Sequence, residues 1–233
     1  MSNISSNGKI QPIVEHGQLT IDATRPGPVL GSELYGVFIE DLNHAADGGL
    51  YAELVQNRSF EFDPMDNATY HSLSAWSLVE RGDGIASIRT ESVSPLNANN
   101  LNYLVLEIVQ AGTGVGVMNH GFNTGIPVKE GEQYRFSFYA RRSESFAEPV
   151  RIRLESTTGT LHGEATVIVD SDKWKQYTAT LTANATDTAG RLVLLTTGKG
   201  KVYMDMVSLF PERTFRNRPN GLRADIAQMI ADL

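Results

Sequence analysis

The stretch Tyr134-Arg135-Phe136-Ser137-Phe138-Tyr139-Ala140 decides the fold of this 233-residue chain. Aromatic rings occupy every second position of the first five residues, and Arg135 and Ser137 stand between them. Successive side chains of a β-strand point to opposite faces of its sheet. The stretch therefore predicts a strand with one apolar face and one polar face.

The same two-residue period recurs through the middle of the chain. Val150–Glu155 alternates three aliphatic residues with two arginines and a glutamate, and turn-rich stretches such as Thr157-Thr158-Gly159 separate the runs. Comparable runs are Tyr103–Val109, Gln176–Thr182, Arg191–Thr197 and Val202–Leu209. Many short strands of this kind predict a mainly β chain, with an antiparallel β-sandwich over residues 57–213.

The sequence before residue 57 has a different character. Residues 1–17 are polar, and we expect them to be disordered. Residues 18–24 alternate apolar and polar side chains, and residues 34–39 form an apolar run, so both predict strands. Good helix formers in residues 50–55 predict a short helix.

The sequence after the sandwich predicts a linker and a helix. Residues 217–221 combine Asn, Pro and Gly, as linkers do. Apolar residues then recur at helical spacing in residues 222–233, and no C-capping signal follows. Since nothing in the chain is left to cover this apolar stripe, we expect residues 18–56 and 214–233 to be parts of one interrupted, truncated domain.

Composition excludes several classes of function. The chain has a net charge of −7 and no cysteine, so disulfides and thiolate chemistry are absent. No run of Lys or Arg suggests a nucleic-acid partner, and no apolar run approaches a membrane span. The N-terminus lacks a signal-peptide core. We expect a secreted or periplasmic protein whose signal was removed, with a cytoplasmic location as the alternative.

The segment from Leu34 to Glu61, which contains Glu-Asp-Leu-Asn-His at 40–44 and Gln-Asn-Arg-Ser-Phe-Glu at 56–61, resembles the N-terminal signature of glycoside hydrolase family 51. Residues 221–233 resemble the first barrel helix of these α-L-arabinofuranosidases. Residues 76–210 are similar to the galactose-binding-like carbohydrate-binding modules, of jelly-roll type, inserted in one branch of the family. The resemblance implies that this sandwich is flanked by the first elements of an incomplete (β/α) barrel.

The resemblance also implies a division of catalytic roles. The family uses one Glu as acid/base and another as nucleophile, and both lie beyond the part that this chain matches. We therefore assign no catalytic residue here and expect the chain alone to be inactive. The family's Glu that matches Glu40 hydrogen-bonds the arabinofuranosyl ring, and Asn43 lies close by. Because Glu40 follows the apolar run, we expect it at the C-terminal end of a barrel strand. The alternatives are an exposed acid at a strand end for Glu40 and a polar loop for Asn43.

Two strands suggest a sugar-binding face. Tyr139 and Arg141 on one strand, with Arg151 and Arg153 on another, are predicted to form a polar face with an aromatic platform. An ordinary solvated sheet face is the alternative. Trp76 and Trp174 stand beside apolar residues, so we expect both to pack in the core.

Asp205 suggests a metal site. It shares the parity of Val207 and Leu209, so a regular strand would bury it, and a buried carboxylate needs a cation or several donors. Sandwiches of the resembled type hold a structural calcium at such a position, shared with a Glu like Glu61. Oxygen ligands suit calcium. The alternative is an Asp held by backbone amides.

The sequence therefore predicts the N-terminal portion of an α-L-arabinofuranosidase that releases terminal arabinofuranosyl residues from plant polysaccharides. Its expected partners are an arabinose-containing glycan and the remainder of its own catalytic domain. The alternative is a non-catalytic sandwich with a structural or adhesion role and no glycan ligand.

Overall fold

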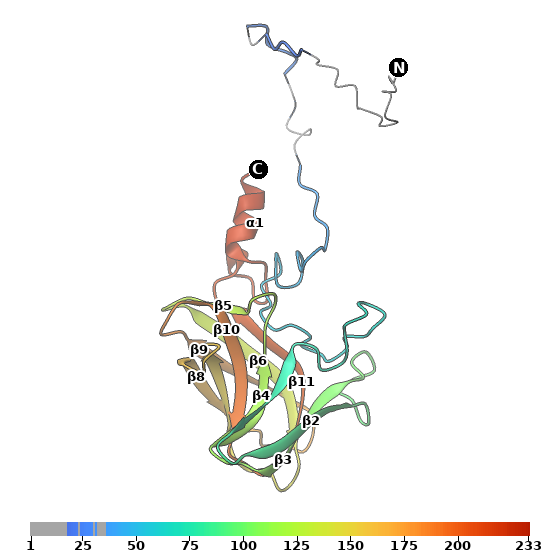
Figure 1. Cartoon of the computed structure of the whole chain (residues 1–233), viewed down its shortest axis with the longest axis vertical. Coiled ribbons are helices and arrows are strands. Elements are labelled where there is room, and N and C mark those ends of the chain that lie inside the picture. The colour runs from blue at the N-terminus through green and yellow to red at the C-terminus, as the bar shows by residue number, and fades with distance from the viewer. Residues whose placement is uncertain (1–17, 23, 30, 32–35) are drawn as a thin grey trace, which may run out of the picture. The chain divides into compact units, whose positions relative to one another are not determined.

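The computed structural model describes residues 18–22, 24–29, 31 and 36–233 (Figure 1). The chain divides into two compact units, residues 1–36 and residues 37–233. The predicted disorder of residues 1–17 lies outside the described residues. The second unit contains all the strands described below.

Eleven strands follow one another from residue 76 to residue 211. Their bounds are β1 Trp76–Arg81, β2 Ile85–Glu91, β3 Tyr103–Gln110, β4 Gly114–Asn119, β5 Ile126–Val128, β6 Gln133–Arg142, β7 Val150–Glu155, β8 Leu161–Val167, β9 Lys175–Thr182, β10 Asp187–Thr196 and β11 Gly200–Pro211. A short 3₁₀ turn, η2 Phe215–Asn217, and a helix, α1 Ala224–Ala231, close the chain.

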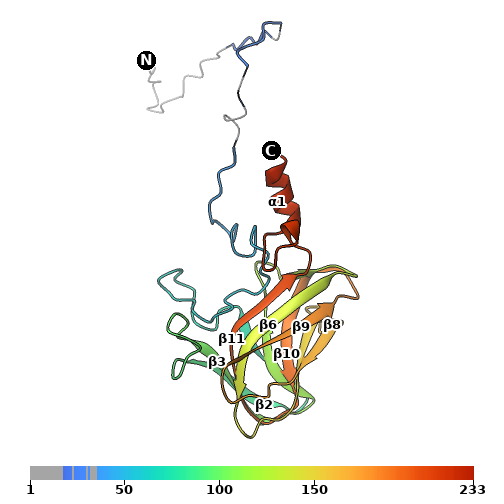
Figure 2. The same ribbon diagram turned by 180° about the vertical axis from the view of Figure 1, so that it is seen from behind.

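The strands form two antiparallel sheets (Figure 2). The six-stranded sheet has the order β1-β4-β10-β7-β8, and β5 also pairs with β10. The five-stranded sheet has the order β2-β3-β11-β6-β9. The predicted antiparallel β-sandwich is confirmed.

The core lies between the two sheets. Phe136, Phe138 and Ala140 of β6 are fully buried there, as the alternation in the sequence predicts. Trp76 joins this core with 6% of its surface exposed, and its indole N–H donates to the Asn57 carbonyl at 3.0 Å. Trp174 does not, because it lies before β9 on the outer side of the five-stranded sheet.

A bulge in β11 changes which residues face the core. Val202 and Met204 are core residues, and so are Val207 and Leu209, although the two pairs differ in parity. The pairing with β6 shifts between Asp205 and Ser208, and Met206 adopts a φ of 49°. Asp205 pairs with the outward-facing Tyr139. The expectation that Asp205 shares a face with Val207 and Leu209 is therefore wrong, because the bulge resets the alternation.

The segments flanking the sandwich differ from their predicted structures. Residues 18–22 and 36–39 form no strand, and residues 23, 34 and 35 lie outside the described part. Residues 50–55 form no helix, because the buried Glu53 accepts from their own Leu54 and Val55 amides and from the Leu209 amide of β11.

The predicted C-terminal helix is present as α1. No described helix is long and apolar enough to cross a membrane.

Candidate functional site

The four residues predicted to share one sugar-binding face lie on two different sheets. Tyr139 and Arg141 belong to β6 of the five-stranded sheet, whereas Arg151 and Arg153 belong to β7 of the six-stranded sheet. The prediction of a single face is wrong, because residues 143–149 carry the chain from one sheet to the other. All four sit at outward positions, so the sandwich presents two separate polar faces.

The outer side of the five-stranded sheet carries what we call the aromatic face, made of Tyr103, Tyr139, Arg141, Trp174 and Tyr203. The Arg141 guanidinium lies 4.3 Å from the ring centre of Tyr203, 5.1 Å from Trp174 and 5.4 Å from Tyr103. Its Nη2 also donates to the Tyr103 hydroxyl at 3.2 Å. Cation–π contacts of this kind stabilise a partly desolvated arginine by about 0.5–2 kcal/mol each.

The loops beside the aromatic face fix its rings. The Trp174 indole N–H donates to the Ser94 carbonyl at 3.1 Å, and the Tyr103 hydroxyl donates to the Val93 carbonyl at 2.6 Å. Tyr103 is 1% exposed, while Tyr139, Trp174 and Tyr203 keep part of their surface open. Rigid, half-exposed rings with polar groups beside them are suited to contact a flat, hydroxylated ligand.

The outer side of the six-stranded sheet carries what we call the arginine face, made of Arg81, Arg151, Arg153, Glu155 and Glu164. Glu155 is 3% exposed and stands between two guanidinium groups, at 2.5 Å from Arg81 Nη2 and 2.5 Å from Arg153 Nη1. Arg153 Nε lies 2.8 Å from Glu164. This face is held by charge pairs rather than by rings.

The predicted metal ligands come together at one end of the aromatic face. Asp205 is fully buried, and its Oδ1 accepts from the Met206 amide at 2.7 Å. Its Oδ2 has no hydrogen-bond partner in the described structure. The pKa of Asp205 is raised to about 7, chiefly by burial and also by the nearby Glu61 carboxylate, while the Met206 amide and Arg58 oppose the rise. Glu61 itself accepts from the Asn102 amide and side chain.

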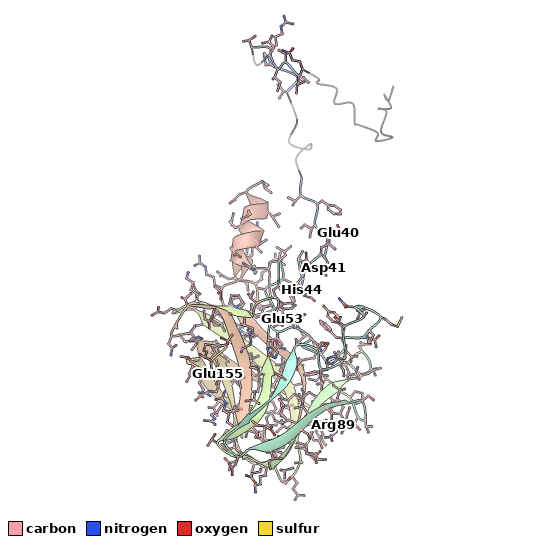
Figure 3. The ribbon with its side chains drawn as sticks, viewed as in Figure 1. Glu40, Asp41, His44, Glu53, Arg89 and Glu155 are labelled. Carbon is pink, nitrogen blue, oxygen red and sulfur yellow. The ribbon has the colours of Figure 1, made fainter. Side chains whose placement is uncertain are left out.

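Glu40 and Asn43 lie on an exposed stretch without strand structure (Figure 3 labels Glu40). The expectation that Glu40 ends a barrel strand is not met by residues 36–39, which are extended and exposed. Neither residue lines the two cavities beside Glu53, of about 770 and 500 Å³. Their role in binding substrate remains a prediction.

Glu53, which sequence reasoning missed, is 2% exposed and joins the segment before the sandwich to its last strand. Its oxygens accept from the Leu209 amide at 2.8 Å, from the Ser208 hydroxyl and from Arg58 at 3.3 Å. Burial raises the pKa of Glu53, and these donors oppose the rise. The sequence carries no signal for it beyond a lone acid among apolar neighbours.

Comparison with known proteins supports a carbohydrate-binding chain. Residues 52–200 match the family model described as a carbohydrate binding domain. An extracellular exo-α-L-arabinofuranosidase of Streptomyces chartreusis is 43% identical over 92% of this chain and 24% of its own length. α-L-Arabinofuranosidase 1 of Arabidopsis thaliana is 33% identical over 92% of this chain and 32% of its own length.

A solved structure agrees with these matches. The arabinose-bound MgGH51 α-L-arabinofuranosidase superimposes with a TM-score of 0.74 at 33% identity, over 85% of this chain and 32% of that one. The chain thus spans only a quarter to a third of the length of these relatives. It belongs to the carbohydrate-binding domain family, and its homologues are α-L-arabinofuranosidases, as the resemblance of Leu34–Glu61 implies.

Proposed function

We propose that this chain is the carbohydrate-binding, N-terminal portion of a retaining α-L-arabinofuranosidase that removes terminal arabinofuranosyl residues from plant polysaccharides such as arabinan. The aromatic face carries the binding part of this proposal. Because the Streptomyces relative is described as extracellular, we extend the proposal to a secreted or periplasmic location.

The aromatic face has the composition that sugar recognition requires. A furanose or pyranose ring offers an apolar C–H face and a rim of hydroxyls, so it is bound by an aromatic ring together with hydrogen-bond donors. Tyr139, Trp174 and Tyr203 supply half-exposed rings, and Arg141 supplies N–H donors between them. Gln176 pairs with Tyr139 across β6 and β9 and adds an exposed amide.

Isothermal titration of the 233-residue chain with linear arabino-oligosaccharides tests this assignment. We expect Tyr139→Ala and Trp174→Ala each to weaken binding about tenfold, since each removes a stacking ring. Arg135→Gln is the matched control, because Arg135 lies on the same strand and pairs with Glu212 away from the rings. Equal binding by all four proteins would overturn the assignment, and circular dichroism would show that each variant is folded.

A purely structural role is the second candidate, and one observation favours it. Arg141 is already enclosed by three rings, and Tyr103 is almost fully buried, so much of the cluster satisfies itself. In that case no neutral glycan binds, and the same substitutions change only the free energy of unfolding. The titration therefore separates the two candidates.

The catalytic part of the proposal concerns the whole enzyme. We propose that Glu40 and Asn43 contact the arabinofuranosyl ring, and that further parts of the catalytic domain cover the cavities beside Glu53. In an α-L-arabinofuranosidase that contains this chain, Glu40→Gln should raise KM or lower kcat on an aryl arabinofuranoside. Unchanged kinetics would remove Glu40 from the substrate site.

We also propose a structural calcium between Glu61 and Asp205. The buried Asp205 Oδ2 lacks a partner, and two neighbouring carboxylates repel each other unless a cation lies between them. Such oxygen donors fit calcium, although no group of three or more acidic, His or Cys side chains suited to a metal occurs in the described residues. Backbone carbonyls and water would have to complete the shell. Chelator should lower the melting temperature, and Asp205→Ala should abolish that sensitivity.

A further inference from the structure

The arginine face carries an excess of positive charge on a chain whose net charge is −7. Its charged side chains alternate with small or apolar residues at the outward positions of the six-stranded sheet. With Arg191 of β10 beside this face, the charged side chains are four arginines and two glutamates: Arg81, Arg151, Arg153, Arg191, Glu155 and Glu164. The Arg191 guanidinium donates to the backbone carbonyls of Thr124, Ala189 and Gly190, so the other three arginines remain to be considered.

Arg151 is the arginine without a counter-charge. Among the described residues, no carboxylate lies within ion-pair distance of its guanidinium, and no hydrogen bond holds it. It pairs with Leu195 on β10 and with Thr166 on β8. Leu195 is 1% exposed although it lies outside the core between the sheets, so the arginine stem can cover it and leave the charged end in solvent.

The neighbouring charge pairs are close but imperfectly satisfied. Glu155 is 97% buried between Arg81 and Arg153, yet its Oε1 makes no well-aligned hydrogen bond within the described structure. The same holds for Arg153 Nε, which faces Glu164. Both atoms are buried from solvent and stay with these charge pairs, so Arg153 is left to donate through its Nη2, which no ion pair of the described residues uses.

The geometry points to the arginine face as a binding surface for an acidic glycan, in which Arg151 pairs with a uronate carboxylate and Arg153 donates to the same sugar. Residues 151 and 153 are next but one along β7, so their side chains project from the same face about 6–7 Å apart. That spacing is close to the length of one sugar residue. A guanidinium binds a carboxylate with two parallel hydrogen bonds, and it also donates to hydroxyl pairs.

The shape of the face suits a chain laid flat across the strands. Gly114 and Gly116 of β4 carry no side chains, and each lies against Leu195 or its neighbour on β10. Thr166 and Ser77 place hydroxyls at the two sides of the sheet. The inference rests on the proposed carbohydrate-binding function for the class of ligand, but it uses a different face and a different charge.

Titration of the 233-residue chain with an oligogalacturonate, and with the same oligomer as its methyl ester, tests the inference. The ester differs from the acid by a methyl group on each carboxyl, which removes its negative charge. We expect the acid to bind at low salt, the ester to bind at least tenfold more weakly, and Arg151→Gln to lose a similar factor for the acid. Arg135→Gln removes the same charge from the opposite sheet and should leave this affinity unchanged.

Four outcomes would overturn the inference: no binding of the acid, equal binding of the ester, equal losses in both variants, or equally strong binding of a polyphosphate of matched charge. The last would mean general attraction of anions rather than recognition of a uronate. The neutral arabino-oligosaccharides of the aromatic-face experiment distinguish the two failures, because they report on Tyr139 and Trp174 and not on Arg151.

Discussion

Each outer face of the sandwich contains one buried carboxylate among the described residues, and the two carboxylates have opposite electrostatic surroundings. On the arginine face, Glu155 stands between Arg81 and Arg153. On the aromatic face, the guanidinium of Arg141 is enclosed by rings, and Asp205 makes no ion pair with the described residues, although the charge of Arg58 lies near it. A charge removed from water needs either an opposite charge or another polarisable partner. The comparison teaches that the environment of a buried carboxylate depends on what its own strand and the more distant strands supply. Glu155 meets Arg153 of its own strand and Arg81 of β1, whereas Asp205 stands opposite Tyr139.

The largest expected effect concerns the unpaired carboxylate. The pKa of Asp205 is raised to about 7 in the folded state, whereas an unfolded Asp keeps the ordinary value of 3.8. Between these values the folded chain binds a proton that the unfolded chain does not, so stability falls as pH rises through this window. A gap of about three pKa units corresponds to roughly 4 kcal/mol. Urea unfolding at pH 4.5 and pH 8, in chelator, measures it as the difference between wild type and Asp205→Asn.

The variant is needed because other carboxylates titrate in the same range. Asp205→Asn should unfold with a flatter pH profile than wild type, and calcium added at pH 8 should stabilise wild type alone. Parallel profiles for the two proteins would show that Asp205 is not the group responsible. The contrast between the two buried carboxylates would then disappear.

The paired carboxylate should give the next largest effect. Glu155→Gln leaves Arg81 and Arg153 without their shared counter-charge, and breaking a buried pair costs about 3–5 kcal/mol. Because about a third of Arg81 is exposed, we expect about 2–3 kcal/mol in the free energy of unfolding. Glu164→Gln, at a carboxylate that is 35% exposed, should cost less than about 1 kcal/mol. Similar losses in both variants would contradict the importance of burial.

The ring-enclosed guanidinium should contribute less than the paired carboxylate. Arg141→Met keeps an unbranched apolar stem and removes the guanidinium, so it measures the interaction with Tyr103, Trp174 and Tyr203. We expect a loss of about 1–2 kcal/mol, with Trp174 fluorescence changing because its ring contacts the guanidinium. A stabilised variant would show that the rings do not compensate for the charge.

The smallest effect should come from Arg151. Since no carboxylate of the described structure pairs with it, Arg151→Gln should change the free energy of unfolding by less than about 0.5 kcal/mol. Chemical denaturation beside Arg153→Gln, which removes two ion pairs, provides the comparison. A large loss for Arg151→Gln would assign it a structural role and weaken the case for a ligand.

Much of the sandwich was predictable because its strands are half-buried. β6, β7 and β9 alternate without interruption, and their predicted bounds differ from the observed ones by at most two residues. β4 was not predicted, and β10 was predicted only from Arg191 onward. β4 mixes glycines with valines, and β10 contains Leu192, Val193, Leu194 and Leu195 in succession, since its outer face is also covered.

The sites were less predictable, because they depend on contacts between distant strands. The sequence of residues 134–155 does not indicate that β6 and β7 belong to different sheets. The single face predicted for them is therefore two separate faces in the structure. The bulge at Met206 contains no Gly that would have indicated it in the sequence. It places the Asp205 side chain on the face of the sheet opposite to the one predicted. Trp174 resembles a core residue in sequence, but the ring of Tyr103 and the charge of Arg141 hold it outside.

Glu53 has a mechanical consequence for the protein that contains this chain. The segment entering the sandwich and the segment leaving it run side by side: the Leu54 amide donates to Leu209, Ala52 to Gly221, and the Arg223 amide to Leu50. We call this pairing of the two segments the joint. The buried Glu53 carboxylate stabilises it by accepting hydrogen bonds from Ser208 and Leu209. A pull on the two flanks would therefore load the joint first. The sheets would stay folded and their two faces intact until the joint had parted.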